Sequence, residues 1–264
     1  MQNKNNPPVA ITSGATILTL GGLIGLGGAE FRLPLLIGLF GFGAIEAVIL
    51  NKAMSLIVVT TALPFRTNVI SFSQILEHWH IVVTLLSGSL IGAWLGAGWA
   101  TKIKSQTLYK TISILLLLIA IVLLFGHGLQ THQSLINGWP LAAIGAFTGV
   151  GIGLVSSIMG VAGGELLIPT IVLLFGVDIK LAGSLSLAVS LPIMLVGFAR
   201  YSQDQSFKII RKEWKFVLLM AIGSVFGVYI GGQLLGMLPT ELLLPLLAVI
   251  LVLSAFKVWK HSNG

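Results

Sequence analysis

GLGGAEFRLP, residues 25–34, and GVAGGELLIP, residues 160–169, are two versions of one glycine-rich box that ends in proline. Each box lies within a long apolar run, and the second follows the first at a spacing of 135 residues. The same spacing, without a gap, pairs Gly14 with Gly149, Glu30 with Glu165, Gly41 with Gly176, Ser55 with Ser190, Trp79 with Trp214, and Gly88, Gly92 and Gly96 with Gly223, Gly227 and Gly231. The chain is therefore predicted to contain two copies of one unit. In a duplicated membrane protein, glycine-interrupted segments at corresponding positions indicate the transport site.

The composition predicts a helical protein that crosses the membrane several times. Hydrophobic residues make up 56% of the 264 residues and charged residues only 9%, against about a quarter charged in a soluble domain. Runs such as 81–100 and 214–235 have about the length that crosses a bilayer core as a helix. They are continuously apolar, whereas strands of a membrane barrel alternate with a period of two. We therefore expect an all-α polytopic fold.

Charge and cysteine content exclude several functions. The net charge of +7 is interpreted as loop charge that sets membrane orientation, so no nucleic-acid partner is expected. The absence of cysteine excludes disulfides, thiolate chemistry and iron–sulfur clusters. The polar N-terminus is followed by no cleavage site of small residues, so no removable signal peptide is predicted.

Each copy is predicted to consist of a broken hairpin and three helices within one integral membrane domain. Repeat 1, residues 9–126, would contain a hairpin at 9–41 and helices at 44–63, 81–100 and 108–125. Repeat 2, residues 141–256, would contain a hairpin at 141–176 and helices at 181–199, 214–235 and 242–256. The first hairpin segment has about 33 residues, which is too long for one helical crossing of the membrane and too short for two. This length favours two half-length helices. Gly27-Gly28 and Gly163-Gly164 lie where the chain must turn, because glycine allows a positive φ.

The distribution of basic residues predicts the orientation. If each hairpin enters and leaves on the same side, one face receives most of the Lys and Arg residues: Lys4, Lys102, Lys104, Lys110, Arg200, Lys208, Arg211, Lys212, Lys215, Lys257 and Lys260. This face would be cytoplasmic, together with both termini. Each copy then has an odd number of full crossings, so the two copies would be inserted as inverted repeats.

The boxes are the candidate binding site. A helix N-terminus carries free N–H groups and a partial positive charge, which attract anions. Each box restarts a helix, with Glu30 or Glu165 in its first turn and with Pro34 or Pro169 where the missing N–H is expected to cost little. Two such ends that meet near the bilayer midplane would suit a small oxyanion. The predicted substrate-binding backbone comprises Gly27, Gly28, Ala29, Gly163 and Gly164.

Glu30 and Glu165 have two possible roles, because a carboxylate at this depth is costly unless it is protonated or paired. Each could cap its own helix N-terminus. Alternatively, one or both could titrate and couple proton movement to anion movement. Protons are therefore a candidate coupling ion.

Arg32 and Lys52 occur only in the first copy, since Leu167 and Leu187 stand at the equivalent positions. One interpretation is that they neutralise Glu30 and Glu46, or extend to the cytoplasmic surface. The other is that they form part of the anion site. Neutral hydrogen-bonding groups on the next helix of each copy are further candidates, although such groups often only bond their own backbone; they are Asn51, Ser55, Thr60, Thr61, Ser186 and Ser190.

Other motifs point away from catalysis. Residues 77–80, EHWH, lack the spacing of a zinc-protease motif and are interpreted as an interfacial anchor. The sequence contains no nucleophile elbow, P-loop or catalytic Asp pair, so we expect no enzyme, no cofactor and no metal. The glycines at 88, 92 and 96 have a period of four, which lays small residues on one helix face for close packing.

The doubled box resembles that of the TauE/SafE family of bacterial membrane permeases, the sulfite exporter family. The family's pattern of Gly-x-Gly-Gly-Gly, four residues and Pro matches with one alanine in each copy, Ala29 and Ala162. The resemblance covers residues 14–256. It implies transport, usually export, of sulfite, thiosulfate, organosulfonates or similar small anions across the bacterial cytoplasmic membrane. Carried over to this chain, its site would contain Gly27, Gly28, Glu30, Pro34, Gly163, Gly164, Glu165 and Pro169.

The sequence thus favours a secondary transporter of small sulfur-containing anions that works by alternating access. A cation or metal carrier with Glu30 and Glu165 as ligands is the alternative within transport. An intramembrane enzyme or an assembly factor without flux is the alternative outside it. Substrate, coupling ion, direction of transport and oligomeric state are not determined by the sequence.

Overall fold

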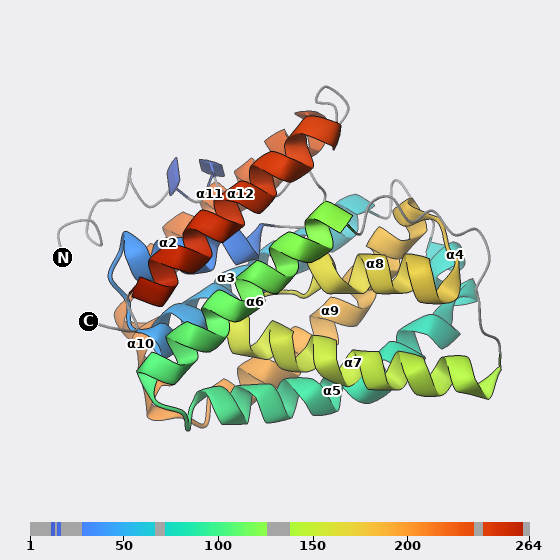
Figure 1. The fold of residues 1–264 in the computed structure, drawn as a ribbon, viewed down its shortest axis with the longest axis horizontal. Coiled ribbons are helices and arrows are strands. Elements are labelled where there is room, and N and C mark those ends of the chain that lie inside the picture. The colour runs from blue at the N-terminus through green and yellow to red at the C-terminus, as the bar shows by residue number, and fades with distance from the viewer. Residues whose placement is uncertain are drawn as a thin grey trace.

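The computed structural model describes residues 12–13, 15–16, 28–66, 72–125, 138–234 and 240–260. Within these ranges every regular element is a helix, which confirms the all-α prediction (Figure 1). The elements are α2 (Ala29–Gly38), α3 (Ala44–Arg66), α4 (Phe72–Glu77), α5 (Trp79–Ala100), α6 (Ser105–Phe125), α7 (Trp139–Met159), α8 (Gly164–Phe175), α9 (Ile179–Tyr201), the 3-10 helix η1 (Gln205–Phe207), α10 (Lys208–Lys212), α11 (Trp214–Leu234) and α12 (Thr240–Lys260).

Several of these helices have the length and apolar character of membrane spans. In the part of the chain that the structure describes, Ala44–Thr61, Trp79–Ala100, Trp139–Met159 and Leu181–Tyr201 meet this criterion. Ser105–Ile121, Gly164–Phe175 and Trp214–Gly227 are shorter apolar segments. Large apolar side chains cover the outside of the bundle, including Phe147 at 80% and Phe256 at 72% exposure, as expected for a surface that faces lipid tails. The chain is a multi-pass membrane protein.

Helices α5 and α7 form the most intimate contact of the bundle, and they run in the same direction. Gly88, Gly92 and Gly96 face the backbone of Ala146, Val150 and Leu154 in turn. A Cβ atom on Gly92 would collide with the carbonyl oxygen of Val150. The glycine ladder therefore acts as predicted, because only glycine allows two helix backbones to approach this closely.

Equivalent helices of the two copies also pack against each other. Helix α3 contacts α9, and α6 contacts α12. Both pairs are antiparallel: Lys52, early in α3, lies beside Gly197, late in α9, and Lys110, early in α6, lies 5.7 Å from the ring centroid of Trp259 at the end of α12. Helix α5 packs on α9 as α11 packs on α3.

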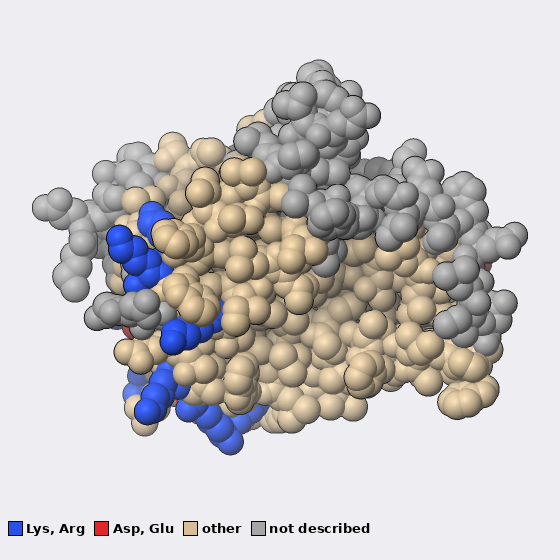
Figure 2. Space-filling view, in the orientation of Figure 1, with Lys and Arg blue, Asp and Glu red and all other residues tan. Residues whose placement is uncertain are grey.

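Most basic side chains of the described ranges gather at one end of the bundle, at the left of Figure 2. We call this the basic end; it comprises the α5–α6 connection, the segment from Arg200 to Lys215 and the end of α12. Arg200 lies beside Gly98 and 5.4 Å from the ring centroid of Trp94, and Lys257 packs over Gly38. Lys4 lies outside the described residues.

The hairpin of the second copy differs from the prediction of two half-length arms. Helix α7 has 21 residues, about 32 Å at 1.5 Å per residue, which is a full crossing. Helix α8 has only 12 residues and returns toward the end of the molecule at which α7 begins (Figure 1). The turn lies at Gly160 to Gly163, close to the predicted Gly163-Gly164, but the first arm begins at Trp139 and is therefore long enough for a full crossing, so the expected half-length first arm was wrong. Of the first arm in the other copy, residues 17–27 lie outside the described ranges.

Candidate functional site

Both boxes turn the chain through glycines with a positive φ. Gly28 precedes α2 with a φ of 62°, and Gly163 precedes α8 with a φ of 85°. Gly160, with a φ of 67°, ends α7. A residue with a Cβ atom is strained in this conformation, which explains the glycines. Gly27 lies outside the described residues, and Gly164 is the first residue of α8.

The prolines lie deeper in their helices than predicted. Pro34 is the sixth residue of α2, and Pro169 is the sixth residue of α8. At this position a residue would normally donate its N–H to the carbonyl four residues earlier, which belongs to Glu30 in α2 and to Glu165 in α8. Because proline has no N–H, each helix loses one backbone bond next to its box. The expectation that the missing N–H costs little was therefore wrong.

Arg32 is completely buried and is held by neutral groups. Its Nε donates to Oδ1 of Asn51 at 2.7 Å, and one terminal nitrogen donates to the Asn51 carbonyl at 3.1 Å and to the Ser55 hydroxyl. The other terminal nitrogen reaches the Ser224 hydroxyl on α11 at 3.4 Å. The planar guanidinium therefore links α2, α3 and α11, and it is a fixed positive charge inside the bundle.

Asn51 connects the two boxes. Its side-chain nitrogen donates to the Ala29 carbonyl of the first box at 3.1 Å and to the Met159 carbonyl next to the second box at 3.1 Å. Ser55, at the middle of α3, donates to the Gly160 carbonyl at 3.4 Å. Helix α3 therefore connects the two boxes at the points where the chain is not helical.

Lys52 is a second buried basic side chain and follows Asn51, the partner of Arg32, in α3. It is completely buried, and its Nζ donates to the Ser157 hydroxyl at 3.4 Å. The Ser157 carbonyl accepts a hydrogen bond from the Tyr201 hydroxyl at 2.8 Å. Gly197 borders the ammonium group, since a Cβ atom there would lie 2.9 Å from Nζ. A larger residue at 197 would displace the ammonium.

The structure contradicts the interpretation in which these cations extend to the surface, and it brings Arg32 near enough to Glu30 for the two charges to interact without a direct ion pair. Arg32 and Lys52 have 0% exposure, so neither extends to the surface. Among the described residues the hydrogen bonds of Arg32 go to Asn51, Ser55 and Ser224, and that of Lys52 to Ser157, with no ion pair to Glu30 or Glu46. Glu46 instead accepts a hydrogen bond from the backbone N–H of Gly43 at 3.2 Å.

Glu30 and Glu165 face each other at the start of α2 and α8. Both are buried, with 0% and 2% exposure, and the two carboxyl groups lie close enough to interact directly. Apart from the two carboxyl groups themselves, no side chain of the described residues provides a hydrogen bond to their four carboxyl oxygens. Each lies in the first turn of its helix, as the capping interpretation expects, while the N-cap residues Gly28 and Gly163 have no side chain that could form a cap hydrogen bond.

The remaining polar candidates divide into two groups. Ser186 donates to the Gly183 carbonyl within its own helix, and Thr60 and Thr61 do the same toward Leu56 and Ile57, as expected of hydroxyls in membrane helices. Ser190 is buried, and its hydroxyl has no partner among the described residues.

Sequence reasoning missed three residues at the site, Ser157, Tyr201 and Ser224. A sequence signal existed for Ser224, because the spacing of 135 residues pairs it with Ser89, so both copies have a serine at this position of an apolar run. Ser157 pairs with Gly22 and Tyr201 with Arg66, so the repeat contained no signal for them.

The site is closed in this conformation. Its charged side chains have at most 2% exposure. Two hollows of the described part of the chain, of about 770 Å³ and 290 Å³, are lined by other residues. In the same part of the chain no three His, Cys, Asp or Glu side chains are grouped as metal ligands would be. Within the EHWH segment, Nδ1 of His78 lies 2.9 Å from the Gln74 carbonyl, and Trp79 is 61% exposed.

Comparison with known proteins places the chain in a family. No curated protein and no solved structure matches it. The family model described as sulfite exporter TauE/SafE matches residues 8–258, which is nearly the whole chain. The match includes both boxes and every helix of the site. The chain therefore belongs to the TauE/SafE family of sulfite exporters.

Proposed function

We propose that this protein is a secondary transporter that exports small sulfur-containing anions, such as sulfite, thiosulfate or organosulfonates. The family is one of membrane transporters, and its printed description names sulfite. A small anionic substrate and a lipid bilayer are the partners that follow from this membership. Transport, and not enzymatic catalysis, is the activity that we assign.

The observation that carries the proposal is the buried charge between the two boxes. Arg32 and Lys52 are buried basic groups that form no direct ion pair with a carboxylate among the described residues. Asn51 links Arg32 to Ala29, the first residue of α2, and to Met159 beside the break that precedes α8. Fixed cations and helix N-termini attract an oxyanion and replace its water shell. A cation buried at this depth is costly, so an arriving anion would offset part of that cost.

The packing of equivalent helices supports an alternating-access mechanism. We propose that the two copies are inverted repeats, which fits the antiparallel packing of α3 on α9 and of α6 on α12. In such transporters the site lies between the repeats, and rocking of one repeat against the other exposes it to each side in turn. The closed conformation would then be an occluded state. We place the basic end and both termini on the cytoplasmic side of the cell membrane.

A carrier of cations is the second candidate, and one observation favours it. The four carboxyl oxygens of Glu30 and Glu165 receive no hydrogen bond from any other side chain of the described residues, and such oxygens are ligands that hard cations prefer. In the anion transporter, protonation of one or both carboxyls would remove the cost of burying a charged carboxylate. Protons are therefore the proposed coupling ion.

Flux into proteoliposomes separates these candidates. We expect the purified protein to transport labelled sulfite, thiosulfate or a small organosulfonate, and to leave divalent cations outside. The Arg32→Gln variant, which removes the charge, should lose most anion flux. The matched control is Arg200→Gln at the surface of the basic end, which should transport as the parent does. Cation flux without anion flux, or anion flux unchanged in Arg32→Gln, would reject the proposed function.

A further inference from the structure

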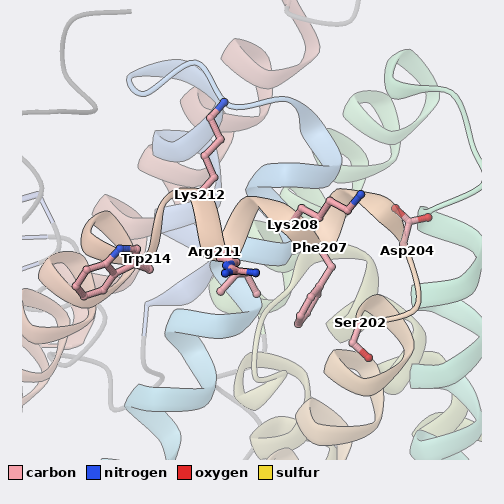
Figure 3. Close-up of a pocket in the computed structure, with 8 residues that line it drawn as sticks. Ser202, Asp204, Phe207, Lys208, Arg211, Lys212 and Trp214 are labelled. Carbon is pink, nitrogen blue, oxygen red and sulfur yellow. The ribbon is translucent and has the colours of Figure 1, made fainter.

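The segment between α9 and α11 forms a hollow at the basic end that the transport site does not use. Its volume is about 770 Å³, and its lining includes Phe207, Lys208, Ile210, Arg211, Lys212 and Trp214. Figure 3 shows these side chains on η1, α10 and the start of α11, with Arg211 between Trp214 and Phe207 in that view. The hollow thus combines three cations with aromatic and aliphatic groups.

The hollow is anchored to the protein core on one side. Ile209 of α10 is 6% exposed and packs into the main core. The Phe207 ring meets the Phe198 ring edge to face, with centroids 5.0 Å apart. Because one face of α10 is anchored in this way, Lys208, Arg211 and Lys212 are exposed on the other. The cations are therefore presented outward on a fixed element.

The charge of this segment exceeds what the fold requires. Residues 200–215 contain five basic and two acidic side chains, a net charge of +3. Asp204 is the acidic residue in the lining, and its Oδ1 accepts a hydrogen bond from the Ser206 N–H at 2.8 Å. In the first copy the positions of Lys208, Arg211 and Lys212 are taken by Ser73, Leu76 and Glu77. The repeated unit thus folds without these cations, which suggests a role other than folding.

We propose that this hollow binds the phosphate headgroup of an anionic phospholipid from the adjoining membrane leaflet. Trp214 is 53% exposed at the first residue of an apolar helix, a position typical of the membrane interface. Basic pockets at this level attract anionic headgroups, and arginine matches the geometry of phosphate. Phe207 and Ile210 provide an apolar surface for the glycerol and upper acyl carbons. A free phosphate ion would use the cations but not this surface, which favours the lipid.

Lipid binding to the full-length protein in detergent tests the proposal. Phosphatidylglycerol and phosphatidylcholine with the same acyl chains are titrated separately, and bound lipid is counted by native mass spectrometry. We expect preferential retention of phosphatidylglycerol. The triple variant Lys208→Gln, Arg211→Gln, Lys212→Gln should lower its apparent affinity at least tenfold, since each basic residue near an anionic surface contributes about fivefold.

The matched control removes the same charge from the same end of the molecule but outside the hollow: Lys102→Gln, Lys104→Gln, Lys260→Gln. This variant should bind phosphatidylglycerol as the parent does, and circular dichroism should show the same helix content in all three proteins. Equal binding of the two lipids by the parent, or equal losses in both triple variants, would overturn the proposal. Displacement of phosphatidylglycerol by inorganic phosphate at comparable concentration would show a site for soluble phosphate and would also overturn it.

Discussion

At the scale of single residues, the two copies contribute different groups to the candidate site. Arg32 and Lys52 have leucines as their equivalents, yet both are completely buried beside groups of the other copy, Ser224 and Ser157. One copy thus provides the buried cations and the other provides hydroxyl groups that contact them. A duplicated framework with a one-sided charge suits a single anion site, because two symmetric sites would need cations in both copies.

Asn51→Ser tests the connection between the boxes. The side chain of Asn51 makes three hydrogen bonds, to Arg32, to Ala29 and to Met159, and serine, its equivalent in the second copy, is too short to replace them. We expect a loss of about 2 kcal/mol in the free energy of unfolding, because buried partners remain unsatisfied. Thermal unfolding in detergent measures it. The control Gln203→Ala, which removes the exposed acceptor of Arg200, should change stability by less than about 0.5 kcal/mol.

Glu30→Gln combined with Glu165→Gln tests proton coupling. Glutamine has nearly the shape of glutamate but does not titrate, so the double variant should still bind the anion while a pH gradient no longer drives its uptake. Thermal shift measures the binding, and proteoliposome flux with and without the gradient measures the coupling. Glu46→Gln, whose carboxylate accepts from the Gly43 N–H, is the control. Undiminished gradient-driven flux in the double variant would exclude coupling through these carboxyls.

At the scale of elements, the helix breaks and the glycine contacts determine where the charges meet. A break after α7 directs the N-terminus of α8 into the bundle, and the loss of one backbone bond at Pro169 leaves the Glu165 carbonyl without its helical donor. Non-helical backbone at membrane depth is tolerated only where protein or water satisfies it. Asn51 and Ser55 do so for Met159 and Gly160.

Gly163→Ala is expected to lower anion affinity at least tenfold, because it changes the turn that aims the first amides of α8. The substitution also strains the backbone, with a φ of 85° at this position. Gly41→Ala provides the matched control, since Gly41 has a φ of 65° and a Cβ atom there meets nothing within 4 Å. Both variants should lose similar stability, and only Gly163→Ala should lose binding in a thermal-shift titration. Equal anion affinity in the two variants would show that the first amides of α8 do not bind the anion.

Gly153→Ala should destabilise the protein through the contact of α5 with α7. A Cβ atom at Gly153 would collide with the carbonyl oxygen of Ser89, so the helices must separate, at a cost of about 1–3 kcal/mol. Gly151→Ala, two residues earlier in the same helix, meets nothing within 4 Å and should stabilise by up to about 1 kcal/mol through helix propensity. Unfolding midpoints that move in the same direction would contradict this account of the packing.

At the scale of the whole molecule, the distribution of charge predicts how the bundle is oriented in the membrane. The α5–α6 connection and α10 lie at the same end in the structure (Figures 1 and 2), and we propose from the positive-inside rule that this end faces the cytoplasm. The opposite end, where Trp139 begins α7 with 81% exposure, would then face outward.

Labelling of single introduced cysteines tests this orientation. The sequence contains no cysteine, so any label must be on the introduced residue. A maleimide that does not cross membranes should label Trp139→Cys in intact cells. It should label Lys104→Cys and Lys212→Cys only after the membrane has been permeabilised. Labelling of positions 104 and 212 from opposite faces would overturn the topology. The helices themselves would stand, since their lengths and packing do not depend on the orientation.

The sequence by itself determined the helical class, the duplication and the positions of the breaks, since these depend on local properties: apolar length, a repeated spacing and glycine where φ must be positive. It did not predict the short helices α4 and α10, which are too short to leave a hydropathy signal. Only the tertiary structure decided that α7 is a full crossing, that Arg32 and Lys52 are held by neutral partners, and that Ser157, Tyr201 and Ser224 join them. The physical reason is that these contacts join residues up to 192 positions apart, and side chains so distant in sequence meet only through the packing of whole helices.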